Sequence, residues 1–148
     1  MGTRLRPGDV LELTTDKGRI CVHYVGRHSE YGDGVIVCPT LHASRAPVNN
    51  DLFREGYFTF YPAAAAVGQS LANVIGNLPS PGLPKRFRRP GARYDRTITT
   101  WIVEDGAGEV VKQRLSEEER RLPIAAIWNH EMLLHRVSEG WRPEIEGQ

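Results

Sequence analysis

Residues 85–96, KRFRRPGARYDR, hold the clearest group of side chains that could recognise a charged partner. Six of these twelve residues are Lys or Arg, one is Asp, and two are aromatic. Arginine guanidinium groups bind phosphates or carboxylates, and aromatic rings stack on nucleic-acid bases. The segment therefore fits three interpretations: it binds nucleic acid, it binds an acidic protein surface, or it is simply solvated. The candidate contact residues are Arg86, Phe87, Arg88, Arg89, Arg93 and Tyr94.

A second charged group, EEERR, follows at residues 117–121. Glu117, Glu118 and Glu119 are candidates for an acidic surface that faces a partner. The alternative is a solvated helical turn, in which carboxylates and guanidinium groups three or four positions apart pair with one another. Both interpretations stay open at the level of the sequence.

Neither the histidines nor the cysteines form a recognised catalytic or metal-binding pattern. His130 and His135 are five positions apart, so on a helix their rings diverge by roughly 140°, whereas a zinc-binding helix needs a spacing of four. Cys21 and His23 alternate onto the same side of a strand, but a catalytic cysteine needs an electropositive, partly open setting. No glycine-rich phosphate loop is present. We therefore expect no catalytic residues, no cofactor and no metal.

The overall charge argues against a dedicated nucleic-acid-binding domain. The 148 residues carry a formal net charge of +1. The isoelectric point of about 7.9 lies below the value of about 9 that is typical of such domains. Residues 97–148 hold six basic and ten acidic residues, which would repel a phosphate backbone. The segment 85–96 therefore suits an acidic protein partner, and nucleic acid is kept as the alternative.

The two cysteines and the N-terminal sequence indicate where the protein resides. Cys21 and Cys38 lie in apolar, β-branched surroundings, which favours buried free thiols, and a disulfide would require an oxidising compartment. The first residues contain no apolar leader segment, and no apolar run approaches eighteen residues. We expect a cytoplasmic protein without a membrane segment.

Strand patterns dominate the N-terminal half. Three segments are either apolar throughout or alternate between apolar and polar residues, and they are 10–13, 19–26 and 35–39. Turn residues separate them, which predicts an antiparallel meander. Residues 56–62 are aromatic and predict a fourth strand. The following Ala-rich segment, 62–77, predicts a helix that begins at a proline and ends near a glycine. Residues 77–96 are proline-dense and predict an extended loop.

The C-terminal half predicts a hairpin and two helical segments. Residues 97–103 and 110–113 read as strands around a Gly-containing turn. Ser116 and Glu119 match a capping box, and Asn129 can cap a last helix that Gly140 ends. The chain is therefore expected to be a single α+β domain, residues 1–148. Its architecture would be a twisted antiparallel sheet of about six short strands with a central Ala-rich helix and a C-terminal helix.

The order of these motifs resembles a known family. RPGDVLEL followed by RICVHYVGR is similar to the opening of the immunity protein 26 family, small bacterial proteins that begin with two such strands. TTWIVEDGAGEVVKQRLSEEERRLP and IWNHEMLLHRVSEGW are compatible with related immunity proteins. The resemblance covers residues 6–38 and 97–142 and rests on scaffold segments, so no functional residue is carried over.

The resemblance implies a non-enzymatic protein that binds and neutralises a cognate toxin of a bacterial polymorphic-toxin system. The alternative function is a small nucleic-acid-binding or regulatory module that uses the segment 85–96.

Overall fold

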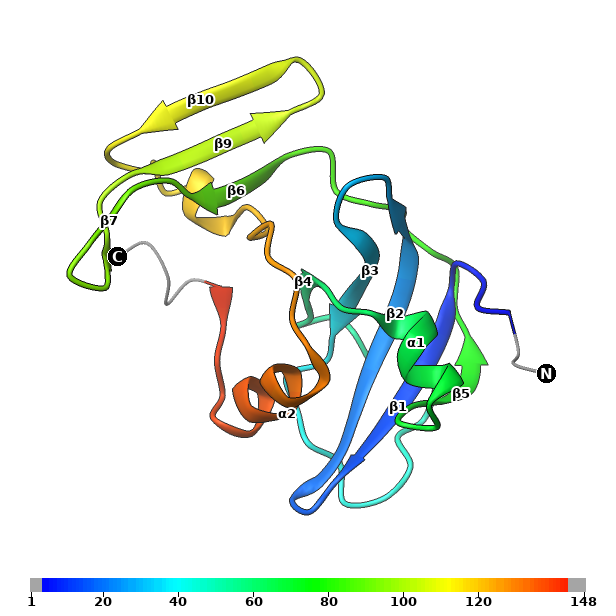
Figure 1. The fold of residues 1–148 in the computed structure, drawn as a ribbon. Coiled ribbons are helices and arrows are strands. Elements are labelled where there is room, and N and C mark those ends of the chain that lie inside the picture. The colour runs from blue at the N-terminus through cyan, green and yellow to red at the C-terminus, as the bar shows by residue number, and fades with distance from the viewer. Residues whose placement is uncertain (1–3, 144–148) are drawn as a thin grey trace. The chain divides into compact units, whose positions relative to one another are not determined.

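The computed structural model describes residues 4–143, which form strands and helices in two compact units (Figure 1). Among these residues, unit 1 comprises 4–83 and Ile127–Trp141, and unit 2 comprises Pro84–Ala126 and residues 142–143. Antiparallel strands and a few short helices confirm the expected α+β class. The described residues contain ten strands rather than about six. The assignment of the whole chain to a single domain stays a prediction.

Unit 1 is built on a five-stranded antiparallel sheet with the strand order β4-β3-β2-β1-β5. The expected meander of the first three strands is confirmed, because β1 pairs with β2 and β2 pairs with β3, both antiparallel. Apolar side chains from these strands make the core of the unit. The strands are β1 (Asp9–Thr15), β2 (Gly18–His28), β3 (Gly32–Val37), β4 (Tyr57–Phe60) and β5 (Asn73–Asn77).

The prediction of a helix over residues 62–77 is wrong after residue 68. Helix α1 covers only Ala63–Gly68, and Ser70 then turns the backbone with a φ of 61°. Residues Asn73–Asn77 form β5, which pairs antiparallel with β1. The alanines favour a helix locally. After the turn, Val74 and Ile75 favour a strand, and their segment forms backbone hydrogen bonds with the edge of β1.

The C-terminal helix is confirmed with both of its expected ends. Helix α2 runs from His130 to Ser138, and the side chain of Asn129 accepts a hydrogen bond from the Met132 backbone N–H at 2.7 Å. Gly140 follows with a φ of 73°, a conformation that suits glycine. Leu133 and Val137 are the buried residues of the helix. No helix among residues 4–143 is long and apolar enough to cross a membrane.

Unit 2 contains a three-stranded antiparallel sheet, ordered β10-β9-β6, and a separate small hairpin of β7 and β8. The expectation that residues 77–96 form one extended loop is therefore wrong. Residues 87–90 pair with β9 along one side. On the other side the Arg88 backbone N–H donates to the Pro123 carbonyl at 2.9 Å. The strands are β6 (Phe87–Pro90), β7 (Arg93–Tyr94), β8 (Thr97–Ile98), β9 (Trp101–Asp105) and β10 (Gly108–Lys112).

The core of unit 2 is small and lies against one face of this sheet. Trp101, Val103 and Leu115 form a buried cluster. A short 3₁₀ helix, Glu119–Arg121, follows Leu115, and the expected capping box is confirmed. The Ser116 N–H donates to the Glu119 carboxylate at 2.9 Å, and the Glu119 N–H donates to the Ser116 hydroxyl at 3.1 Å.

Candidate functional site

The side chains of the basic segment, residues 85–96, differ in how deeply they are buried. Arg88 is fully buried, with 0% of its surface exposed, and Phe87 is 5% exposed. Arg88 donates from Nε to the Leu122 carbonyl at 3.2 Å and from Nη2 to the Pro143 carbonyl at 2.7 Å. Its guanidinium carbon lies 4.4 Å from the ring centre of Trp101. The expectation that Arg88 and Phe87 contact a partner is corrected, because both side chains are buried.

Arg86 and Arg89 are half-buried and engaged with carboxylates of the same unit. Arg89 contacts Glu109 at 3.1 Å and Glu104 at 3.7 Å. Arg86 lies 3.7 Å from Glu118, whose side chain is 84% exposed. An ion pair this long and this exposed is weak in water, so Arg86 stays available to another anion.

Arg93 and Tyr94 belong to the β7–β8 hairpin, and both are exposed. Tyr94 has 78% of its surface in solvent. The turn of this hairpin, Asp95 and Arg96, has φ values of 48° and 68°, which is the geometry of a tight two-residue hairpin turn. Of the six residues expected in the basic segment, these two are the ones that the fold leaves fully open to a partner.

The three residues of the expected acidic group, Glu117, Glu118 and Glu119, differ in burial. Glu119 is 8% exposed and lies 3.2 Å from the Lys112 ammonium. The Ser116 backbone N–H, and next the Lys112 side chain, hold the pKa of Glu119 below its usual value. Glu117 pairs with Arg121 at 3.2 Å. Glu118 lies 3.7 Å from Arg86, and the side chains of Glu117 and Glu118 are 87% and 84% exposed, so these two carboxylates stay available to a partner.

Strand β10 is a feature that the sequence pattern did not single out. It is the outermost strand of its sheet (Figure 1), and its two valines are largely in solvent, Val110 at 55% and Val111 at 67%. The sequence predicted that the strand with these two valines is the second strand of a hairpin. No pattern in the residues indicated that the strand would lie at an open edge.

A cavity lies beside β10. Its volume is about 410 Å³, within the range of about 300–1,000 Å³ that is usual for ligand pockets. Val103, Val110 and Lys112 share one face of the sheet by register and line the cavity, together with Arg86, Glu109 and Glu119. Asp105, Ala107 and Gly108 complete the lining, so the cavity combines two valines with two cations and three carboxylates.

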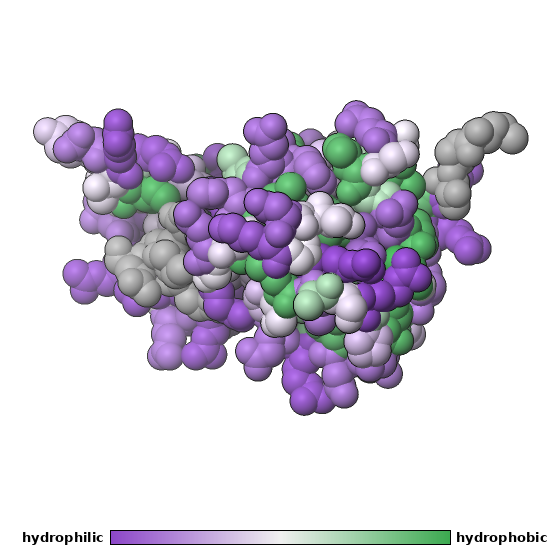
Figure 2. Space-filling model, turned by 90° about the horizontal axis from the view of Figure 1, so that it is seen from below, coloured by the Kyte–Doolittle hydropathy of each residue, from purple (hydrophilic) through white to green (hydrophobic). Residues whose placement is uncertain are grey.

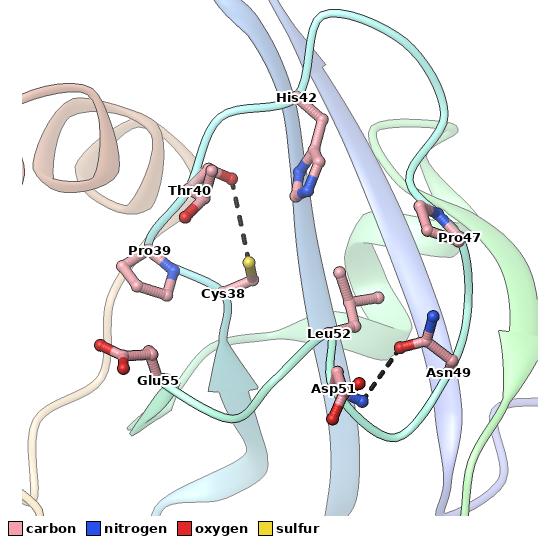
Figure 3. Close-up of a pocket in the computed structure, with 9 residues that line it drawn as sticks. All are labelled: Cys38, Pro39, Thr40, His42, Pro47, Asn49, Asp51, Leu52 and Glu55. Atoms are coloured by element: carbon pink, nitrogen blue, oxygen red, sulfur yellow. Dashed lines mark hydrogen bonds between the residues drawn. The ribbon is translucent and has the colours of Figure 1, made fainter.

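Unit 1 has a second cavity, of about 340 Å³, beside the end of β3 (Figure 3). The Cys38 thiol there lies 3.9 Å from the Thr40 carbonyl, and burial raises its pKa. His42 Nδ1 is buried and has no hydrogen-bond partner among residues 4–143. Asp51 is ion-paired with Arg54. The arrangement offers room for a small molecule, but its thiol is not activated as a nucleophile.

The candidate pair Cys21 and His23 is packed inside unit 1. Cys21 is 0% and His23 is 4% exposed. Burial, then the neighbouring Cys38 and Glu12, raises the pKa of Cys21 to about 11. His23 stacks on Phe53 with ring centres 5.2 Å apart. These surroundings are the opposite of the electropositive, open setting in which a cysteine becomes nucleophilic.

The two helix histidines have separate partners. His130 Nδ1 lies 2.8 Å from the Tyr61 hydroxyl, and burial lowers the pKa of His130. His135 lies 3.3 Å from Glu139 on the surface of α2. No group of three or more His, Cys, Asp or Glu side chains within residues 4–143 is arranged to hold a metal ion.

Comparison with known proteins gives no match. No protein-family model, no curated protein and no solved structure matches the chain. The resemblance to the immunity protein 26 family therefore stays a prediction. We base the functional proposal on the residues and contacts of the chain itself.

Proposed function

We propose that this protein binds a partner protein and neutralises it, as bacterial immunity proteins do with a cognate toxin, in the cytoplasm of the cell that makes both. The observation that carries the proposal is strand β10. Its outer side pairs with no other strand in residues 4–143, and its two valines are mostly exposed. An open apolar edge is a liability for an isolated protein because it invites pairing with other chains. A partner that covers the edge explains why it is retained.

The surface chemistry is consistent with recognition of a protein. Figure 2 shows one face of the molecule, on which hydrophilic residues predominate and apolar residues form smaller areas between them. Protein interfaces combine small apolar centres with a polar, charged rim. Charged groups around such a centre steer the encounter and exclude wrong partners.

The state of the two cysteines supports a role without catalysis. Burial raises the pKa of both thiols, so little thiolate is present at neutral pH. The thiolate is the nucleophilic form of cysteine. The candidates for enzyme chemistry that the sequence offered are therefore better explained as packing groups, and we propose a binding protein rather than an enzyme.

Co-expression tests the proposal. The chain is produced in a bacterial host together with each toxin-like product encoded next to its own gene. We expect one of these products to stop growth when expressed alone, and the chain to restore growth and co-purify with it at a fixed ratio. If every neighbouring toxic product remained toxic and none formed a complex, the proposal would be abandoned.

A nucleic-acid partner is the second candidate, and one observation favours it. Tyr94 is exposed at the tip of the β7–β8 hairpin and stands between Arg93 and Arg96, which are also exposed. An aromatic ring beside arginines can stack on an unpaired base and hold its phosphate. The burial of Phe87 and Arg88 removes two of the six expected contact residues.

Retention of the protein on heparin and on oligonucleotide columns at low salt tests whether it binds nucleic acid. Binding would weaken steeply as salt rises, because bound phosphates release counterions. A chain that is not retained on either matrix at low salt does not bind nucleic acid.

A further inference from the structure

The two cysteines of the chain are direct neighbours across strands β2 and β3. The register of these strands pairs Val22 with Val37. The ladder continues one step further, because the Cys38 N–H donates to the Cys21 carbonyl at 3.0 Å. Side chains of residues opposite one another on antiparallel strands point to the same face of the sheet. Cys21 and Cys38 therefore lie side by side on one face, and both belong to one buried cluster with Ala46.

This placement suits a disulfide bond. Hydrogen-bonded residue pairs on antiparallel strands have Cα atoms about 5.5 Å apart, which lies inside the range of roughly 4.4–6.8 Å found for disulfides. The Cβ atoms of such a pair must approach by about 1 Å to reach the spacing of a disulfide. Strand β3 ends at Val37, so Cys38 lies just beyond the regular ladder. Its thiol contacts the Thr40 carbonyl at 3.9 Å, a weak interaction that a covalent bond to Cys21 would replace.

The native fold keeps both thiols from reacting with an external oxidant. Cys21 is 0% exposed, and Cys38 is 4% exposed at the edge of the cavity of unit 1, toward which its sulfur points (Figure 3). Burial, and after it the neighbouring Cys38, raises the pKa of Cys21 to about 11, and burial also raises the pKa of Cys38. Exchange with a disulfide starts from a thiolate. Exchange is therefore slow in the folded protein, whereas the thiols of the unfolded chain are solvated and open to it.

We propose that Cys21 and Cys38 are joined in a disulfide when the chain folds in the presence of a small disulfide oxidant, such as oxidised glutathione, and stay free thiols when it folds under reducing conditions. One cysteine thiolate attacks the glutathione disulfide and releases the first glutathione. The second cysteine thiolate attacks the protein–glutathione disulfide and releases the other. Two electrons pass from the protein to glutathione, and the two thiol protons end on the released glutathione molecules.

The bond links β2 to the segment after β3 and closes the loop of residues 21–38. A closed loop restricts the unfolded chain, which stabilises the folded unit 1. In a reducing cytoplasm, glutathione and thioredoxin keep thiols reduced, so the state of the pair depends on the compartment in which the chain folds. This inference goes beyond the proposed function and does not depend on it.

Refolding of the full-length protein tests the pairing. The chain is unfolded in urea with a reductant and diluted into a glutathione redox buffer, while a second sample stays folded in the same buffer for the same time. Both samples are then unfolded again, treated with a maleimide that labels free thiols, and weighed by mass spectrometry without reduction. We expect the refolded monomer to contain an internal disulfide and no maleimide, and the sample that stayed folded to carry a maleimide on each cysteine.

The stability of the oxidised and reduced wild type is compared in urea, with the ¹⁹F signal of a labelled Trp128 as the probe of unit 1. We expect the urea midpoint of the oxidised form to be higher by about 1 M. Cys38→Ala is the matched control, because it keeps Cys21 but cannot form the internal bond. Its midpoint should be the same with and without added reductant, whatever the substitution itself costs.

Several results would overturn the inference. A refolded wild type that keeps both free thiols, or that gives only glutathione adducts or linked pairs of chains, would show that folding does not join the two cysteines. An internal bond that lowers the urea midpoint would show that the native sheet does not accept it. Equally fast oxidation of the sample that stayed folded would show that the thiols react in the native state rather than during folding.

Discussion

The buried Arg88 offers the sharpest test of how unit 2 is held together. Replacing it by Met keeps a long, unbranched side chain in the same space but removes the guanidinium group. The β6 backbone hydrogen bonds to the chain at residues 123–125 do not depend on the side chain, so the strand itself should persist. What is lost is the attachment of Arg88 to the carbonyls of Leu122 and Pro143 and to the ring of Trp101.

The size of the effect follows from these contacts. Two hydrogen bonds from a charged donor contribute about 3 to 6 kcal/mol together, after desolvation is included. The contact with the Trp101 face adds about 1 to 2 kcal/mol when it is shielded from water. Packing of the Met side chain returns roughly 2 kcal/mol. We therefore expect Arg88→Met to lower the free energy of unfolding of unit 2 by about 2 to 6 kcal/mol, and the lost hydrogen bonds account for most of this decrease. Arg88→Lys should lose less, because it keeps a charge but cannot reach both carbonyls as a planar fork does.

The assay must report on unit 2 separately. The chain has three tryptophans, and Trp101 is the one in unit 2. Labelling with 5-fluorotryptophan gives each of them its own ¹⁹F resonance, so urea unfolding can be followed at Trp101. Arg93→Met is the matched control, because Arg93 is exposed and a substitution there should change stability by less than about 0.5 kcal/mol. If Arg88→Met behaved like this control, the guanidinium would not be a structural anchor and the reasoning would be refuted.

Three further outcomes can be checked. Arg96→Gly should raise stability by up to about 1 kcal/mol in urea unfolding, because a φ of 68° strains a residue with a side chain, and a loss would contradict this. Burial lowers the pKa of His130, so its contribution to stability is present above about pH 6.5 and is lost as pH falls below that value. Unfolding curves of His130→Gln should therefore depend less on pH between about 5 and 7 than those of the wild type, and parallel curves would oppose the assignment. Cys21 and Cys38, both buried with raised pKa, should react slowly with dithionitrobenzoate in the native protein and fully in urea, whereas rapid native reaction would show that the thiols are accessible.

Several elements could be predicted because short-range chemistry determines them. The first three strands follow from apolar segments separated by turn residues, and β1, β2 and β3 pair in the expected order. The Ser116–Glu119 capping box and the Asn129 cap of α2 involve residues three positions apart. In each case the partners are close along the chain, so their pattern is visible without the fold.

Other predictions failed where long-range pairing outweighs local preference. The segment after α1 has a helix-like composition, but residues 73–77 complete the sheet beside β1. The proline-dense stretch looked like a continuous loop, but Phe87–Pro90 lies between β9 and the chain at residues 123–125. A strand gains hydrogen bonds only when a neighbour is present, and the sequence alone does not say which neighbour will be there.

The candidate contact surface shows the same division. The sequence by itself determined that residues 85–96 are rich in arginine and aromatic side chains, and that an acidic turn follows further along the chain. Only the tertiary structure decided that Arg88 and Phe87 are buried, that Glu119 is paired with Lys112, and that β10 is left at an open edge. Burial and edge position depend on contacts between residues far apart in the chain, such as Arg88 with Pro143. Residue type is fixed at each position, but the availability of a side chain to a partner is a property of those contacts.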